Sequence, residues 1–260
     1  MGERFALVGD PSTYVISYPR SGRTWLRLII GKALCHHYRI DERHMLWTER
    51  VTAAAEDVAV TQFFHDDSDF IAPIHAEKLI DNKAYYRNKH VIFLTRAVDD
   101  LLVSAYFHAT RRMRVYEGSI EEFIRDKCFG LPKIIAFYRI WHACAGQPRS
   151  FLHVTYEEMH RTPLAGVRAV LRCLGAVDVP DGVIEMAIGF ASFANMRRLE
   201  ESDYFKHEIM RPGDPSDIES YKVRSGVMGA AAKYLSSSDL LYIYENVNRE
   251  NSPFIRIASK

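Results

Sequence analysis

The stretch YVISYPRSGRTWLRL at residues 14–28 constrains the fold more than any other part of the chain. It begins with a β-branched and aromatic run that is typical of a strand, and Pro19 ends this run because proline has no N–H for a sheet ladder. Apolar residues recur at helical spacing from Trp25 onward, which predicts a helix over residues 22–38. A strand that leads directly into a helix predicts a βα unit with a tight loop at residues 20–22.

This loop carries groups that suit a phosphate. The amino end of the following helix offers unpaired backbone N–H groups and the positive end of the helix dipole, which favour an anion. Gly22 lets the backbone approach a ligand closely. Charged and hydroxyl side chains are added by Arg20, Ser21, Arg23 and Thr24. We therefore predict an anion site here rather than an ordinary βα turn with surface arginines.

The composition is that of an ordinary globular chain. The 260 residues are 48% hydrophobic and 26% charged, with a formal net charge of +1, which predicts a single α/β domain over residues 1–260. This charge gives no reason to expect nucleic acid or an anionic membrane as a partner, and no apolar run is long enough to span a membrane. Four well-separated cysteines without a CxxC pair predict free thiols, a cytoplasmic location and no structural zinc site.

Three further strands are predicted at residues 58–64, 91–95 and 151–155. Helices are expected over residues 77–86, from 99 or 100 onward, and over 120–128, 131–144, 163–175, 181–190 and 239–248. Alternating strands and helices predict an α/β fold with a central parallel sheet flanked by helices. Ligands in such folds bind beyond the carboxyl ends of the strands.

A second polar cluster follows the predicted strand at residues 91–95. Arg96 comes directly after this strand, and Ser104 lies eight residues later on the following helix. An arginine and a hydroxyl at a strand end can bind a phosphate. The alternative is a surface ion pair between Arg96 and Asp99 or Asp100.

The loop YPRSGRTW at residues 18–25 resembles the 5′-phosphosulfate-binding loop of sulfotransferases that use 3′-phosphoadenosine 5′-phosphosulfate (PAPS), whose pattern is YPKSGTTW. Arg20 stands where the family has lysine, and Arg23 stands where it has threonine. The loop is not a Walker A motif, which needs glycine at Ser17 and lysine at Arg23.

Four later segments resemble motifs of the same family in the same order. The family contacts the 3′-phosphate of its cofactor through RxPxDxxxSxY, which is matched here by Arg96, Asp100, Ser104 and Tyr106, with Val98 in place of proline. Tyr156 in TYEEM and Phe193 in SFANMR stand at positions that lie near adenine in the family. The alternatives are a core tyrosine and an ordinary amphipathic helix.

The last of these segments is KVRSGVMG at residues 222–229, which resembles the family flap RKGxxG over the 3′-phosphate. Arg224, Gly226 and Gly229 match, while Ser225 replaces lysine. The alternative is a flexible basic surface loop. Because glycines, prolines and charges dominate residues 200–229, we expect this whole segment to be a flexible flap.

The resemblance is to a cytosolic-type sulfotransferase domain of a bacterial-like member. It implies a P-loop-like three-layer fold, PAPS as donor, 3′-phosphoadenosine 5′-phosphate (PAP) as product and no metal. The sulfuryl group would pass to a hydroxyl or amine of a small-molecule or sugar acceptor, and a homodimer is left open. The implied cofactor-binding residues are Arg20, Ser21, Gly22, Arg23, Thr24, Trp25, Arg96, Ser104, Tyr156, Phe193, Arg224, Ser225 and Gly226.

The family carries a catalytic histidine at a strand end between the first loop and the arginine of the 3′-phosphate site. His65 and His75 both lie in this interval. His65 directly follows the strand at residues 58–64, whereas His75 follows Pro73 in a connection, so we favour His65 as the general base. Arg20 is the second catalytic candidate, because it would stabilise charge on the leaving phosphate.

Two other functions are weighed. A P-loop kinase using ATP and Mg²⁺ is one, since Gly22-Arg23-Thr24 differs by one residue from Gly-Lys-Thr, but it needs an acidic residue at a strand end where residues 94–96 are Leu-Thr-Arg. A non-catalytic PAP-binding protein is the other. The identity of the acceptor is also open. An acidic turn (Asp66, Asp67, Asp69) could bind a cationic or polyhydroxyl acceptor, or it could simply be solvated. Aromatic or sugar acceptors would suit a set of aromatic side chains: Trp47, Phe63, Phe64, Tyr106 and Phe107.

Overall fold

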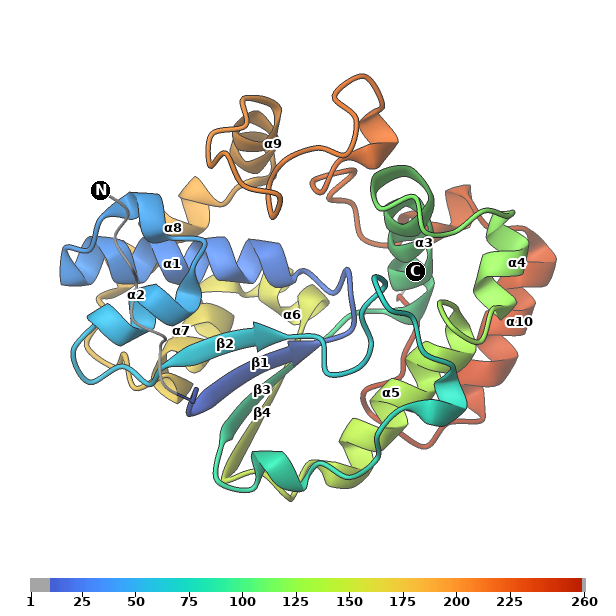
Figure 1. The fold of residues 1–260 in the computed structure, drawn as a ribbon, viewed down its shortest axis with the longest axis horizontal. Helices are drawn as coiled ribbons and strands as arrows, with labels where there is room; N and C mark the ends of the chain where they lie inside the picture. Colours follow the sequence, from blue (N-terminus) through green and yellow to red (C-terminus); the bar gives the residue numbers. More distant parts are fainter. Residues whose placement is uncertain (1–9, 259–260) are drawn as a thin grey trace.

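The computed structural model describes residues 10–258 and has an α/β fold built on a four-stranded parallel sheet (Figure 1). The strand order is β2-β1-β3-β4. The strands are β1 (Thr13–Ser17), β2 (Thr61–Phe64), β3 (His90–Thr95) and β4 (Ser150–Thr155). All neighbouring pairs are parallel. The predicted α/β class and central parallel sheet are therefore confirmed.

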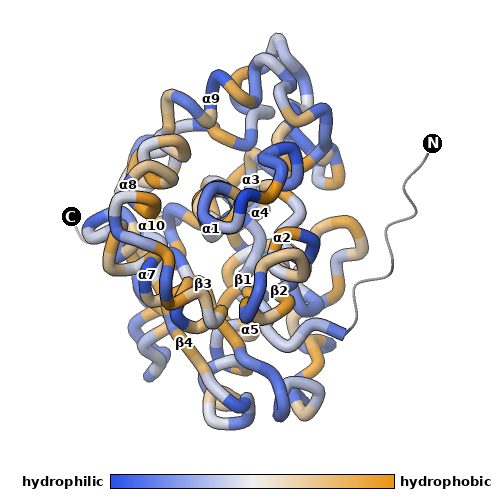
Figure 2. Tube along the Cα trace, turned by 90° about the vertical axis from the view of Figure 1, so that its left-hand side faces the viewer, coloured by the Kyte–Doolittle hydropathy of each residue, from blue (hydrophilic) through white to orange (hydrophobic). Residues whose placement is uncertain are grey.

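Helices cover both faces of the sheet, as the buried side chains of β1 illustrate. Val15 packs into one apolar core, and its neighbours Tyr14 and Ile16 pack into the other, because successive side chains of a strand point to opposite faces. The first core contains α1 (Arg23–Tyr38), α2 (Thr48–Ala54), α7 (Pro163–Cys173), α8 (Asp181–Phe190) and α9 (Phe193–Glu201). The second contains α3 (Val98–Phe107), α4 (Ile120–Arg125), α5 (Leu131–Cys144) and α10 (Ser237–Asn248). In Figure 2 hydrophobic residues recur along the strands and these helices.

The short helix α6 (Tyr156–Arg161) follows β4 directly. Local sequence signals start and end several helices as expected. Ser119 and Ser236 form capping boxes at α4 and α10, and Pro163 is the first residue of α7. No helix among the described residues is long and apolar enough to cross a membrane.

The predicted helix at residues 77–86 is wrong. The segment holds two short 3₁₀ turns, Ala76–Lys78 and Ala84–Tyr86, joined by residues 79–83, which are neither helical nor in a strand. The side-chain oxygen of Asn82 accepts the N–H of Ala84 at 3.0 Å, an Asx-type turn that competes with helix formation. The second strand also begins at Thr61 rather than at residue 58.

Asp66, in the acidic turn after β2, has a structural role that differs from both roles considered from the sequence, which were acceptor binding and a solvated turn. The Asp66 carboxylate is buried and pairs with Lys83 at 2.7 Å. It also accepts hydrogen bonds from Trp141 Nε1 at 2.9 Å and from the hydroxyl of Tyr86 at 2.8 Å. Asp66 is therefore neither solvated nor free to bind an acceptor.

Candidate active site

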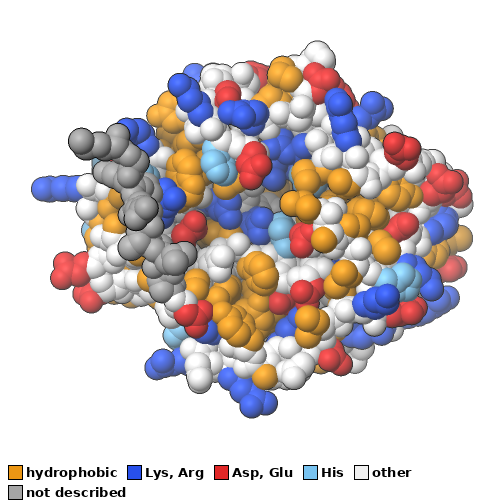
Figure 3. All heavy atoms as spheres, viewed as in Figure 1, with side chains coloured by type: hydrophobic (Ala, Val, Ile, Leu, Met, Phe, Trp, Pro, Cys, Tyr) orange, Lys and Arg blue, Asp and Glu red, His pale blue; other side chains and the backbone are white. Residues whose placement is uncertain are grey.

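A pocket opens at the carboxyl ends of the strands, where the sequence predicts ligand binding. The loop after β1, His65 after β2, Arg96 after β3 and Tyr156 after β4 all line it. Residues of α3, α6 and α9 and the segment after α9 also contribute to the lining. Figure 3 shows Lys and Arg side chains gathered in this hollow of the molecular surface.

The loop after β1 is held in a conformation that brings its backbone close to the pocket. Arg20 and Gly22 both have left-handed backbone angles, with φ of 78° and 93°. A Cβ atom built on Gly22 would collide with the ring of Tyr156. Glycine is thus required here both for its conformation and for the close approach of α6.

The Arg20 side chain joins three parts of the chain. Its Nε donates to Ser104 Oγ of α3 at 3.0 Å, and its Nη2 donates to the carbonyl of Lys222 at 2.9 Å. The backbone carbonyl oxygen of Arg20 accepts a hydrogen bond from Arg96 Nη1 at 3.2 Å. Burial, followed by the nearby charges of Arg112 and Arg96, lowers the pKa of Arg20 to about 9, so it remains protonated at neutral pH.

Arg96 lines the pocket and also forms the ion pair with Asp100 that was weighed from the sequence, but this pair is buried rather than on the surface. Its guanidinium lies 4.6 Å from the ring centroid of Tyr156 and only 3.9 Å from Asp100. The buried Nε atoms of Arg96 and Arg224 have no hydrogen-bond partner among the described residues, although Nη1 of Arg224 donates to Glu219 at 3.0 Å and to the hydroxyl of Tyr234 at 2.9 Å. Buried donors without partners normally find a ligand or water, so the two arginines fit a phosphate-bearing ligand.

Aromatic rings form the opposite wall of the pocket. Trp25 stacks on His160 with the ring centroids 4.3 Å apart, and Tyr156 packs against His160 at 4.4 Å. Phe193 begins α9 and touches the backbone of Gly226, where a Cβ would collide with its ring. A planar base can stack against such a surface.

His65 is oriented by the end of β1. Its Nδ1 lies 2.9 Å from the carbonyl oxygen of Ser17. Since a carbonyl can only accept, Nδ1 carries the proton and Nε2 is left as the basic nitrogen. His75 does not line the pocket; its Nδ1 accepts the N–H of Glu77 at 3.4 Å.

Comparisons with known proteins agree with this arrangement. The sulfotransferase domain model matches residues 10–246. The chain belongs to the sulfotransferase family. It is 26% identical to flavonol 3-sulfotransferase of Flaveria bidentis over 225 residues (80% of this chain, 70% of the relative). It is 25% identical to human sulfotransferase 2A1 over 236 residues (86% and 78%).

Solved structures show the same fold. The sulfotransferase resembles mouse sulfotransferase SULT7A1 complexed with PAP, with a TM-score of 0.63, 18% identity and coverage of 95% of this chain and 87% of the other. It also resembles retinol dehydratase in complex with androsterone and PAP, with a TM-score of 0.62, 13% identity and coverage of 93% and 81%.

The sulfotransferase pocket brings together nearly all the residues predicted from the sequence. Ser21 is the exception among the loop residues, because its side chain is fully buried behind the loop. The pocket is lined by Arg20, Gly22, Arg23, Thr24, Trp25, His65, Arg96, Ser104, Tyr156, Phe193, Arg224, Ser225 and Gly226. The five aromatic residues considered for the acceptor do not line it.

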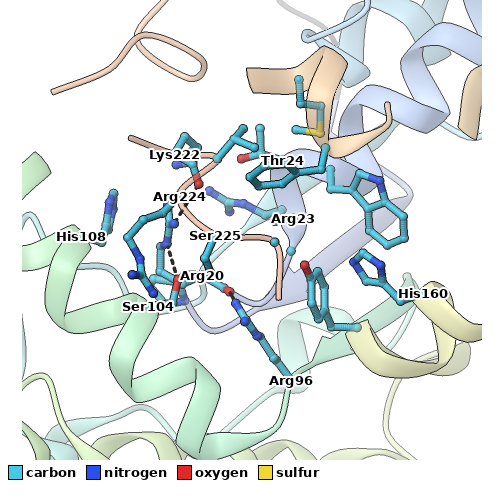
Figure 4. Close-up of a pocket in the computed structure, with 18 of the residues that line it drawn as sticks. Arg20, Arg23, Thr24, Arg96, Ser104, His108, His160, Lys222, Arg224 and Ser225 are labelled. Carbon is cyan, nitrogen blue, oxygen red and sulfur yellow. Dashed lines mark hydrogen bonds between the residues drawn. The ribbon is translucent and has the colours of Figure 1, made fainter. Parts of the chain in front are cut away.

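Three titratable residues of the sulfotransferase pocket were not predicted as site residues: His108, His160 and Lys222 (Figure 4). His160 lies four residues after Tyr156, so helical spacing could have indicated it. His108 begins a π-helical turn that continues α3 to Arg112, which is a frequent feature of functional sites. Lys222 lies in the flap motif, but its direction depends on tertiary contacts that the sequence does not reveal.

We expect His65 to titrate below the usual range in the free sulfotransferase. Burial first, and then the positive charge of Arg23, holds its pKa well below that of an ordinary imidazole. It is therefore neutral at pH 7, and PAP should raise its pKa because added negative charge favours the imidazolium. Histidine NMR titration with and without PAP, assigned with His65→Gln, measures this; a free-enzyme pKa above 6.5 would contradict it.

Proposed function

We propose that this sulfotransferase takes its sulfuryl group from PAPS and passes it to a hydroxyl or amine of a small-molecule acceptor. The observation that carries the proposal is the convergence of Arg20, Arg96, Arg224 and the loop backbone on one pocket with an aromatic wall. The structurally similar proteins solved in complex with PAP support it. A kinase has less support, because β3 ends beside Arg96 rather than an acidic residue.

Each part of the pocket has a proposed role. The 3′-phosphate would be bound by Arg96, Ser104 and Arg224, and the adenine by Tyr156, Phe193 and Trp25. The backbone N–H groups of residues 21–24 at the start of α1 would bind the 5′-phosphosulfate. PAPS supplies an activated sulfuryl group on a phosphate leaving group.

Two side chains then act on the transfer itself. His65 Nε2 removes the proton of the acceptor hydroxyl as that oxygen bonds to sulfur. Arg20 connects the loop to α3 and to the flap through its hydrogen bonds. Its charge stabilises the phosphate oxygen as the sulfur–oxygen bond breaks.

Calorimetry with PAP and AMP tests the donor assignment. PAP should bind more tightly than AMP, because the 3′-phosphate would give the unpaired Nε–H groups of Arg96 and Arg224 a partner, at about 1–3 kcal/mol per group. Arg224→Gln should narrow this difference, whereas Arg211→Gln, which removes an exposed arginine paired with Asp203, should not. Equal affinities for PAP and AMP would contradict the assignment.

We also propose that part of the segment at residues 200–229 closes over the donor. Two carboxylates anchor it: Glu200 accepts the N–H groups of Lys222 and Val223 at 2.6 and 2.8 Å, and Asp100 accepts that of Gly229 at 2.7 Å. Residues 224–228 between these anchors should gain hydrogen-exchange protection when PAP binds. Identical protection with and without PAP would argue against a closing flap.

The single-domain organisation, the cytoplasmic location and a homodimer stay predictions. Relatives named as cytosolic sulfotransferases and four free cysteines support the location. Sedimentation of the purified protein measures the oligomeric state.

A further inference from the structure

The sulfotransferase pocket carries more positive charge than the proposed donor contacts use. Its described lining includes five arginine or lysine residues and no aspartate or glutamate. Arg20, Arg96 and Arg224 have roles toward the donor. The side chain of Lys222 has no proposed donor contact, and Arg23 is assigned to the donor through its backbone N–H and not through its guanidinium.

Arg23, Lys222 and His65 line the same pocket. The positive charges of both side chains help to lower the pKa of His65, after the larger effect of burial, and the charge of Arg23 also helps to lower the pKa of Lys222. In Figure 4 Arg23 and Lys222 lie in the upper part of the pocket, while Arg96 and Ser104 lie in its lower part. The two cations therefore share the pocket with the proposed base and lie away from Arg96 and Ser104 of the proposed 3′-phosphate site.

Lys222 is fixed in this position by its backbone. Its N–H donates to Glu200 Oε1 at 2.6 Å, and its carbonyl accepts from Arg20 at 2.9 Å. Glu200 is already paired with Arg112 at 3.3 Å, so it does not neutralise the lysine. Burial and the neighbouring arginines lower the pKa of Lys222.

Neither side chain has a hydrogen-bonding or charged partner in the part of the chain that the structure describes. Among residues 10–258, no hydrogen bond or ion pair is formed by the Lys222 ammonium or by the Arg23 guanidinium. Arg27, one turn after Arg23 on α1, lies over the ring of Phe63 at 4.7 Å and adds a further positive charge. Clustered cations without counter-charges are unfavourable in a desolvated site, and an anion would relieve this repulsion.

We propose that the acceptor itself is anionic: a hydroxyl compound that carries a sulfate, phosphate or carboxylate group, which Lys222 and Arg23 bind beside His65. This inference rests on the proposed sulfuryl transfer and narrows its acceptor class. The cations hold the anionic group, and His65 receives the proton of the neighbouring hydroxyl.

Matched acceptors test the proposal. One series is hydroquinone, hydroxybenzoate, hydroquinone monophosphate and hydroquinone monosulfate; the other is glucose, glucuronate, glucose phosphate and glucose sulfate. With PAPS as donor, kcat/KM should be at least about tenfold higher for the anionic members than for the neutral one. Comparison within each series shows which anion is bound.

Lys222→Met should reduce this anion preference by about tenfold or more, because a charge-assisted contact is lost while the backbone contacts remain. Arg23→Thr should act in the same direction. Arg211→Gln is the matched control, since Arg211 is exposed, paired with Asp203 and outside the pocket. PAP affinity, measured by calorimetry, should stay within a few-fold of wild type in Lys222→Met.

Binding to the PAP-saturated protein gives a second readout that needs no turnover. Hydroquinone monosulfate should bind more tightly than hydroquinone, and Lys222→Met should remove the difference. A wild-type preference for neutral acceptors would overturn the inference while leaving sulfuryl transfer intact. If Lys222→Met lowered kcat/KM equally for neutral and anionic acceptors, Lys222 would act on the leaving group instead. If it lowered PAP affinity to the same extent, Lys222 would bind the donor. Either result would overturn the inference. Failure to bind PAP at all would instead overturn the proposed function.

Discussion

His65→Gln should lower kcat by about 100- to 10,000-fold, the usual contribution of a general base. The Ser17 carbonyl holds the proton on Nδ1 and leaves Nε2 free to accept one. The amide of glutamine can occupy much of the same space but cannot accept a proton at neutral pH. PAP affinity should change by only a few-fold, because the proposed donor contacts come from other residues.

The matched control is His75→Gln. His75 caps a short 3₁₀ turn and lies outside the pocket, so this variant should keep nearly full turnover. Steady-state rates and PAP calorimetry on both variants show which histidine is the general base. If His75→Gln were inactive and His65→Gln active, the argument from the strand end would be wrong and His75 would be the base.

Gly22→Ala should weaken PAP binding by at least about tenfold. An L-residue at φ of 93° is strained by roughly 1–2 kcal/mol, and the added Cβ would collide with the Tyr156 ring. That ring stacks under Arg96, so its displacement would disturb the 3′-phosphate site as well as the loop.

Gly182→Ala is the control for this variant, because a Cβ at Gly182 meets nothing within 4 Å and its backbone is helical. Thermal unfolding of both variants shows whether the fold is intact, and calorimetry gives the PAP affinity. Unchanged PAP affinity in a folded Gly22→Ala protein would argue against the close approach of the loop backbone to the ligand.

Several site residues lie where the sequence predicted them, because their positions follow from short local sequence patterns. A strand, a proline and a glycine before an amphipathic helix place the loop at Gly22. His65 and Arg96 follow their strands directly, so the parallel sheet carries both to the same edge. No long-range information is needed for these positions.

The errors and omissions arise where distant residues decide the outcome. Residues 77–86 have helical composition, but the local turn at Asn82 and the buried pair of Lys83 with Asp66 hold the segment in another conformation. Lys222 points into the pocket because Glu200 binds its backbone. Such contacts join residues that no short sequence pattern relates.

Transfer from radiolabelled PAPS tests the central claim most directly. The wild-type protein should convert PAPS to PAP and move the label to the hydroxyl of an acceptor from the two series, while His65→Gln should bind PAP and transfer almost no label. Labelled product formed equally well by both proteins would contradict the proposed mechanism. Absence of labelled product from every acceptor, together with no measurable PAP binding, would contradict the function itself.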